Sequence, residues 1–292
     1  MPLSEPQREA VSPTGRLACH SGTYHSYSLD EALTGISTAG FVSVELSASS
    51  WTPHVALEGE SGELSAVTGT LERKLLEHHL HAAALSTSCD ITTAAGQGRA
   101  LQAVHAAADL GVSVLNLAID GQVEGGQAES VLLGDLDVLA DTAEKADVRV
   151  ALEICGRILP SGEKALPLLE RIGRASIGVT YDTANVEFYS GNSAVDDLSW
   201  ILPHVFNVHL KDIAPCRPGC LGYTNSWGTW CLPTIGAGHV DFPSLLSILD
   251  KGGYSGTFSV EIEFQQEPWP ELSEVNESVR QSHAYLRSLG VS

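Results

Sequence analysis

The sequence predicts an α/β protein, a single closed (β/α)8 barrel of the TIM type, and three observations lead to this fold class. Short apolar runs rich in β-branched residues alternate with longer Ala- and Leu-rich amphipathic stretches from about residue 17 to about residue 289, as expected for repeated βα units around a parallel sheet. Eight such runs occur in 292 residues, slightly more than the roughly 250 residues typical of this barrel. The segment after the first run, SGTYHSYSLDEAL, lacks the glycine-rich turn that usually follows the first strand of a doubly wound open sheet, so we favour the closed barrel.

The expected strands and helices follow this alternation in order. Amphipathic patterns predict helices over residues 28–40, 98–111 and 244–253, among others, and several of them end at glycine, as helices commonly do. We find neither a linker nor a low-complexity region, and therefore expect one domain over residues 1–292. The predicted strands cover residues 16–20, 41–46, 81–87, 112–119, 148–154, 176–182, 204–210 and 256–263.

One long irregular stretch, at about residues 212–239, lies between the seventh predicted strand and the helix that follows it. Long loops without secondary structure are usually functional in compact domains, so we interpret this stretch as a lid over the active site. Its aromatic residues, Tyr223, Trp227 and Trp230, are suited to covering a sugar-like substrate, and Arg217 is a candidate for contacting substrate oxygens.

Six cysteines are spread along the chain, mostly in apolar segments, which favours reduced thiols over a disulfide framework. We expect Cys19, Cys89 and Cys155 to be small buried residues. The other three thiols, together with a histidine such as His239, form the alternative to a lid, a zinc site, although their spacing matches no strong zinc signature. These three are Cys216, Cys220 and Cys231.

The charge balance argues against some partners. The chain has 36 acidic and 16 basic residues, a formal net charge of −20, which disfavours binding to nucleic acid or to anionic membranes. The N-terminus has no apolar run of signal-peptide length, and no segment approaches the roughly 20 apolar residues of a membrane span. We therefore expect a soluble, cytoplasmic protein.

Polar residues occur at the carboxyl ends of the last four predicted strands: Glu153, Asp182, His209 and Glu261. Functional side chains of β/α barrels lie at this end of the strands. Each interrupts a run of Val, Ile, Leu or Phe, where a charged group is costly unless it is paired or binds a metal. For any one residue, a helix N-terminus or a loop could supply the partner, but four on successive strands favour one shared cation. Mn²⁺, Mg²⁺ or Co²⁺ suit such a donor set, and Zn²⁺ is also possible.

The order of short motifs strengthens this interpretation. The strings ALEI, YDTAN, VHLKD, GAGHVDF and FSVEIE follow one another over residues 151–263, and GFVSVEL, with Glu45, covers residues 40–46. Together they resemble the xylose-isomerase-like superfamily, which includes tagatose- and psicose-type epimerases, hydroxypyruvate isomerase, inosose dehydratase and endonuclease IV.

The resemblance implies that Glu153, Asp182, His209 and Glu261 bind one divalent ion. Glu263 competes with Glu261, because the two residues share strand parity. Asn185 stands where related epimerases often have a substrate-binding histidine, a departure that speaks against ketohexose epimerisation.

The ligand set also suggests a mechanism. A metal that holds a carbonyl and a neighbouring hydroxyl oxygen acidifies the C–H between or beside them by stabilising an enediolate. Glu153 and Glu261 are the expected pair of bases, one removing and the other returning a proton. The outcome is epimerisation, isomerisation or, if a β-hydroxyl leaves, dehydration. We therefore expect a sugar isomerase or epimerase, with a lyase acting on a keto-cyclitol, a dehydroshikimate-like compound or an oxidised glycoside as the alternative.

Two further classes are less favoured. A DNA-repair endonuclease would need several metal ions and a basic face, which the net charge of −20 opposes. A non-catalytic barrel subunit would have no need of the complete ligand set. We expect a small carbohydrate-like substrate as partner, and a homo-oligomer is possible.

The remaining substrate-binding candidates come from strand ends and loops. Lys211 follows His209 by two residues and is suited to steadying a substrate oxyanion, although a plain ion pair is equally consistent. His25 and His54, like His20, fall near the ends of the first two strands. Asn185, Arg217 and Trp227 complete the predicted set.

Overall fold

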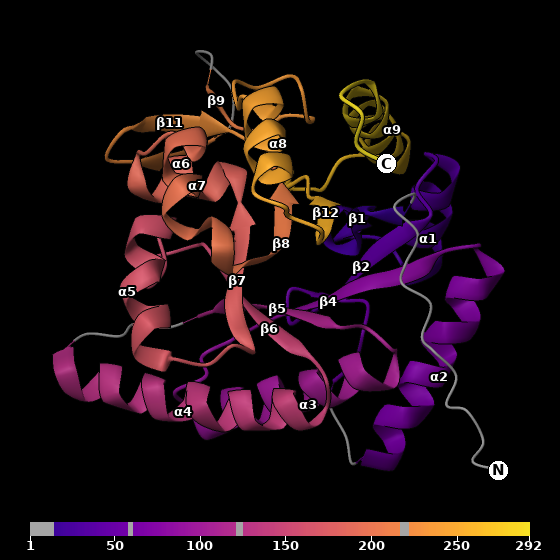
Figure 1. Ribbon diagram of the computed structural model, residues 1–292. Coiled ribbons are helices and arrows are strands. Elements are labelled where there is room, and N and C mark those ends of the chain that lie inside the picture. The colour runs from indigo at the N-terminus through magenta and orange to yellow at the C-terminus, as the bar shows by residue number, and fades with distance from the viewer. Residues whose placement is uncertain (1–14, 58–60, 121–124, 217–221) are drawn as a thin grey trace, which may run out of the picture.

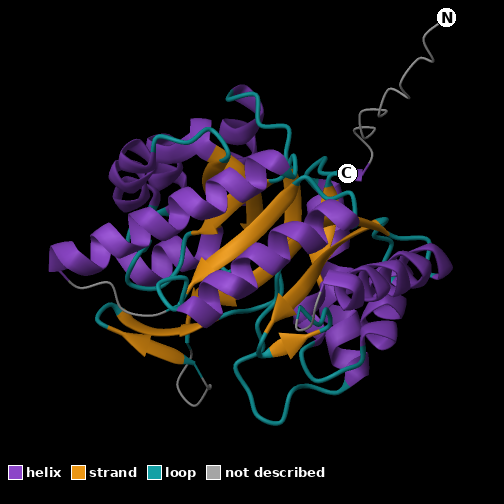
Figure 2. Ribbon diagram, turned by 90° about the horizontal axis from the view of Figure 1, so that it is seen from below, coloured by secondary structure: helices purple, strands orange, loops and turns teal. Residues whose placement is uncertain are grey.

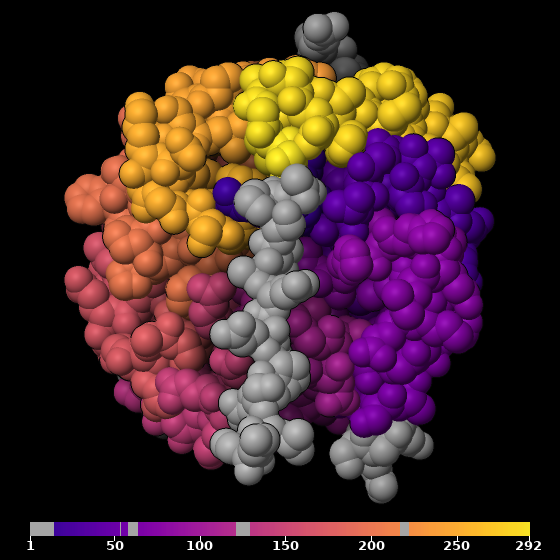
Figure 3. Space-filling view, turned by 45° about the vertical axis from the view of Figure 1, so that its right-hand side comes forward, coloured from indigo at the N-terminus to yellow at the C-terminus, as the bar shows by residue number. Residues whose placement is uncertain are grey.

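In the computed structural model, which describes residues 15–57, 61–120, 125–216 and 222–292, parallel strands close into a barrel (Figure 1). The strand order is β1, β12, β8, β7, β6, β5, β4 and β2, and β1 pairs with both β12 and β2. The predicted closed barrel is therefore confirmed, and the open doubly wound sheet is excluded. In Figure 3 the indigo N-terminal part of the surface lies beside the yellow C-terminal part, as this closure requires.

The barrel strands match the eight predicted runs, with boundaries that differ by a few residues. They are β1 (Leu17–His20), β2 (Ser43–Ser49), β4 (His81–Cys89), β5 (Val114–Ile119), β6 (Arg149–Glu153), β7 (Ile177–Asp182), β8 (Val205–Leu210) and β12 (Thr257–Val260). Every residue of β2 and of β7 is buried, because the strands of a parallel barrel are covered on both faces. A short strand, β3 (Thr52–Pro53), pairs antiparallel with β2.

Helices flank the strands, as Figure 2 shows. They are α1 (Leu29–Thr38), α2 (Ser61–Glu77), α3 (Ala94–Asp109), α4 (Gly125–Lys145), α5 (Gly162–Ile172), α6 (Thr183–Ser190), α7 (Ala194–Ile201), α8 (Phe242–Lys251) and α9 (Leu272–Ser288). Two 3-10 turns, η2 (Ser21–Tyr24) and η3 (Leu202–His204), join the remaining elements. Throughout the described ranges, every helix is too short or too polar to cross a membrane.

Side-chain caps explain where several helices begin. Ser28 and Glu31 form a reciprocal capping box at α1, and Asp241 caps α8 by accepting from the Ser244 amide. Helix α3 begins before the predicted residue 98 because Thr93 accepts a hydrogen bond from the Gly96 amide.

The 212–239 stretch differs from the sequence prediction. It contains a three-stranded antiparallel sheet of β9 (Ala214–Pro215), β11 (Gly228–Cys231) and β10 (Tyr223–Asn225), where we expected an irregular loop. Main-chain pairing of Ala214 with Cys231 places the Cα atoms of Cys216 and Cys231 5.2 Å apart, and these two residues form a disulfide. The expectation of reduced thiols is wrong for this pair.

The disulfide also removes two of the three thiols proposed for a zinc site, so that alternative is wrong for Cys216 and Cys231. Cys220 and Arg217 lie outside the described residues. Cys19 and Cys89 are free and buried, as predicted, whereas Cys155 is free and partly exposed.

Candidate active site

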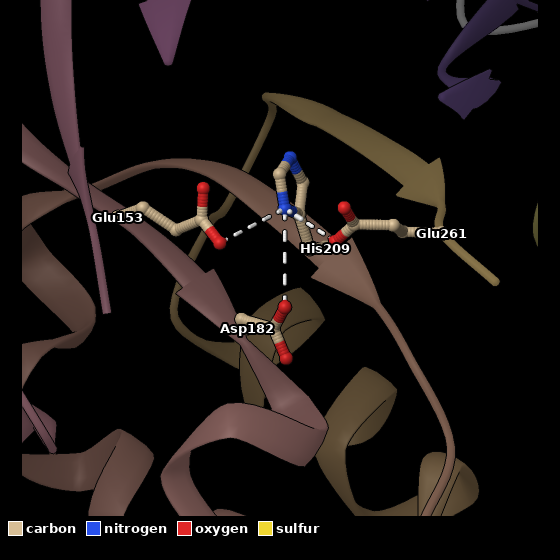
Figure 4. Close-up of side chains that lie close together, drawn as sticks. All are labelled: Glu153, Asp182, His209 and Glu261. Carbon is tan, nitrogen blue, oxygen red and sulfur yellow. Dashed lines mark ion pairs between the residues drawn. The ribbon is translucent and has the colours of Figure 1, made fainter. Parts of the chain in front are cut away.

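The four predicted metal ligands meet at the carboxyl end of the barrel (Figure 4). Glu153 and Asp182 are the last residues of β6 and β7, His209 lies in β8, and Glu261 directly follows β12. Each offers one ligand atom, and these atoms all lie within 4.8 Å of one another. Glu153 keeps a side-chain exposure of 12%, while the other three are almost fully buried.

A buried carboxylate fixes the imidazole of His209. Its Nε2 lies 3.0 Å from Oε1 of Glu45, so Nε2 donates its proton there and Nδ1 faces the ligand group. Nδ1 lies 3.1 Å from Glu261 Oε2 and 3.9 Å from both Glu153 Oε1 and Asp182 Oδ2. The dashed lines in Figure 4 accordingly converge on this nitrogen.

Glu45, on β2, is itself held by several donors. It is fully buried, and its Oε2 accepts hydrogen bonds from Asn207 Nδ2 at 3.0 Å and from the hydroxyl of Ser259. Burial alone would raise the pKa of Glu45, but the adjacent His209 lowers it to about 2. Glu45 belongs to the motif GFVSVEL, but the motif alone did not predict this role. The available signal was a single charge in an otherwise uncharged strand.

The two carboxylates on β6 and β7 are oriented by amides. Asp182 Oδ1 caps α6 by accepting from the amides of Ala184 at 3.0 Å and Asn185 at 2.8 Å, which leaves Oδ2 for the ligand group. Glu153 accepts from Asn116 Nδ2 at 2.9 Å and from Asn185 Nδ2 at 3.3 Å. The contribution of Asn116, a buried residue of β5, was not predicted from the sequence.

Burial raises the pKa of Glu153 to about 7, against the opposing charge of His209. Burial also raises the pKa of Asp182, against the opposing charge of Lys211. A carboxyl group with a pKa near neutrality is suited to exchanging a proton with substrate.

Lys211 is buried at the edge of the ligand group. Its Nζ lies 3.0 Å from Asp182 Oδ2, 2.9 Å from Glu261 Oε2 and 3.0 Å from Glu263 Oε1. Burial would lower the pKa of Lys211, but these carboxylates hold it well above its usual value. Burial would raise the pKa of Glu261, but Lys211 and His209 hold it well below its usual value.

The donor set fits a divalent cation. Within the described part of the chain, Asp182 Oδ2, His209 Nδ1 and Glu261 Oε2 are buried atoms without a hydrogen bond. Their close neighbours are the ion-pair contacts given above, from Lys211 to the two oxygens and between His209 and Glu261. Buried polar atoms are normally satisfied, and one shared cation would satisfy all three of these. Carboxylate and imidazole donors suit Mn²⁺, Mg²⁺, Co²⁺ or Zn²⁺.

A cavity of about 430 Å³ lies near this group: Glu263, one of its lining residues, pairs with Lys211, whereas none of the four candidate ligands is among the described residues that line it. His25 lines the cavity, and its ring lies against Trp51 and Trp269 with centroid separations of 5.6 and 5.1 Å. The remaining lining residues are Tyr223, Glu263, Phe264, Gln265, Gln266 and Glu267.

Two other predicted substrate residues are placed elsewhere. His54 Nε2 donates to the carbonyl of Tyr27 at 3.0 Å, and Trp227 lies over Gly191. Neither belongs to the described residues that line the cavity. Asn185 and Lys211 contact the ligand group directly, as described above.

The fold and the donor group together define a β/α barrel with a carboxylate and imidazole centre at its carboxyl end. The chain belongs to the xylose isomerase-like TIM barrel family, whose model matches residues 34–289.

Comparison with known proteins supports this assignment. Inosose isomerase of Halalkalibacterium halodurans is 30% identical over 131 residues, which cover 44% of each chain. L-ribulose-5-phosphate 3-epimerase UlaE of Salmonella paratyphi C is 25% identical over 202 residues, 67% of this chain and 66% of the relative. The matches thus span about half to two thirds of these relatives. In fold, the chain is similar to a xylose isomerase domain protein from Planctomyces limnophilus, with a TM-score of 0.73, 16% identity, and 94% and 96% of the two chains covered.

Proposed function

We propose that this protein is a divalent-metal-dependent isomerase or epimerase of a small sugar or other polyhydroxylated carbonyl compound. The observation that carries the proposal is the buried group of Glu153, Asp182, His209 and Glu261 beside a cavity of about 430 Å³. The inosose isomerase and L-ribulose-5-phosphate 3-epimerase activities of the two curated relatives support it.

When bound, a divalent cation would polarise the carbonyl and hydroxyl oxygens of the substrate and so acidify the neighbouring C–H bond. In this proposal, the carboxylates of Glu153 and Glu261 carry out the proton transfers. In the metal-free protein, burial raises the pKa of Glu153 to about 7. We assign this carboxylate one of the two proton transfers. Asn116 and Asn185 each donate to one of its oxygens and so hold the carboxylate in a fixed orientation.

Glu261 is the second base of the proposal. Lys211 holds the pKa of Glu261 well below its usual value and so keeps it ionised. We assign Glu261 the side of the reacting carbon opposite Glu153. Lys211 adds a fixed positive charge at the edge of the group, suited to an oxygen that becomes negative during the reaction.

The proposal is tested by incubating Mn²⁺-loaded protein with ketoses, aldoses and inososes in deuterated water. Incorporation of deuterium at the carbon next to the carbonyl, with a product of unchanged composition, is the expected result, and mass spectrometry and NMR would detect it. Loss of water from the product would establish the lyase alternative. No exchange on any sugar by metal-loaded, folded protein would contradict both.

A further inference from the structure

The polar wall of the cavity is negatively charged. It consists of the carboxylates of Glu263 and Glu267 and the amides of Gln265 and Gln266, and no Lys or Arg is among the described residues that line it. Lys211 pairs with Glu263 and also contacts the carboxylates of Asp182 and Glu261. As far as the described residues show, a phosphate group in this cavity would therefore meet like charges without a free cation to offset them.

A second observation concerns the loop between β8 and α8. In β/α barrels, phosphate groups commonly bind at the loops after the seventh and eighth strands. Here the amides of Gly236, Gly238 and Val240 all donate to the carboxylate of Asp212, at 2.9, 2.8 and 3.2 Å. A Cβ at Gly238 would lie 2.1 Å from Asp212 Oδ1, which shows how closely the loop surrounds this carboxylate. The carboxylate of Asp212 thus occupies the backbone amides that could otherwise bind a phosphate group.

The apolar wall suits the uncharged face of a sugar. Four aromatic side chains line the cavity: Trp51, Tyr223, Phe264 and Trp269. Trp269 is fixed by its Nε1 hydrogen bond to the Thr23 carbonyl at 3.2 Å, while Trp51 remains 42% exposed and accessible. Small-molecule sites typically combine such an apolar lining with a few polar groups that set orientation.

From these three observations we infer that the substrate is an uncharged ketose or cyclic polyol carbonyl, and that Glu263 and Glu267 select against its phosphate esters. The inference rests on the proposed function and narrows its substrate class. Of the two curated relatives, one is an inosose isomerase and the other acts on a phosphorylated ketose. The acidic lining of this cavity disfavours a phosphate group, so it is more compatible with an uncharged substrate such as an inosose.

The test compares the affinity of Mn²⁺-loaded protein for matched pairs, L-ribulose with L-ribulose 5-phosphate and D-fructose with D-fructose 6-phosphate, by calorimetry. The free sugar of at least one pair should bind at least about tenfold more tightly than its ester. Glu267→Lys should shift that ratio toward the ester by about tenfold or more, and Glu267→Gln by less. Glu72→Gln, which removes the same charge from an exposed position on α2, should leave the ratio unchanged.

Trp51→Ala should weaken both members of a pair to a similar extent, because stacking does not depend on the phosphate. Tighter binding of the esters, binding of neither member, or a ratio insensitive to Glu267→Lys would overturn the inference. Deuterium exchange keeps the two proposals apart. Faster exchange on the esters would overturn the inference and leave the proposed function intact. Selective binding of free sugars without any exchange would overturn the proposed function and leave the preference for uncharged ligands intact.

Discussion

The two halves of the barrel contribute differently to the same site. The carboxyl ends of β6, β7, β8 and β12 provide the four candidate ligands, whereas β2 and β5 provide side chains that orient them. Glu45 holds His209 from across the barrel, and Asn116 holds Glu153 while also donating to Ser86. The candidate ligands thus all lie in the second half, and the first half supplies two of the buried side chains that orient them, Glu45 and Asn116.

His20, at the end of β1, belongs to the supporting half. Its Nδ1 accepts from the Gly22 amide at 3.1 Å and lies 3.9 Å from Glu261 Oε1. Burial lowers the pKa of His20, so the imidazole stays neutral beside the ligand group. A neutral ring there adds no charge that would compete with a bound cation.

The largest effects are expected in the second half of the barrel. Glu153→Gln and Glu261→Gln should each reduce turnover by about 100-fold or more while metal content is retained, because an amide keeps an oxygen donor but does not accept a proton at neutral pH. Steady-state kinetics and elemental analysis measure the two quantities. Glu170→Gln, at an exposed position of α5, is the control. Near-normal turnover in both site variants would show that they are not the bases.

The supporting half should affect metal affinity instead. Glu45→Gln should weaken metal binding by about 10- to 100-fold, since the amide lacks the charge that keeps the proton of His209 on Nε2. Titration of the metal-free variant with Mn²⁺ gives the dissociation constant. Ser47→Ala, in the same strand, removes a buried hydroxyl that has no hydrogen-bond partner among the described residues, and this variant should bind metal normally. Equal affinities in the two variants would contradict the division between the halves.

The small sheet of β9, β10 and β11 belongs to neither half, and its effects should be smaller. Cys216→Ser together with Cys231→Ser should raise KM severalfold, because Tyr223 of this sheet lines the cavity. The lost cross-link should destabilise the protein by at most about 3 kcal/mol, the chain-entropy value for a loop of about 15 residues. Reducing agent should affect the native protein in the same way and leave the variant unchanged. Loss of metal from the variant would show that this sheet helps to bind the ion.

The smallest expected effect is a difference in KM between variants of two aromatic residues, Tyr223 in β10 and Trp227 in the turn between β10 and β11. Tyr223→Ala should raise KM a few-fold, because the ring lines the cavity. Trp227→Ala should leave KM unchanged, because the indole is 56% exposed and lies over Gly191. Substrate titrations of the two variants make the comparison, and a larger KM change for Trp227→Ala would place substrate on the outer face of the sheet.

The sequence predicted the barrel and the ligand group because both depend on local patterns. Buried strands are continuous apolar runs, and a charge at the end of such a run stands out, as at Asp182 and His209. The supporting contacts could not be predicted in the same way. Glu45 and His209 are 164 residues apart, and their contact depends on how the barrel closes. The pairing of Cys216 with Cys231 likewise depends on the register between β9 and β11.

The central claim is that Glu153, Asp182, His209 and Glu261 bind one divalent ion on which activity depends. Its most direct test is elemental analysis of the purified, active protein. We predict about one divalent ion per chain, its loss in Asp182→Asn and His209→Ala, and reversible loss of activity on chelation. Fully folded and active protein without a bound metal would contradict the account.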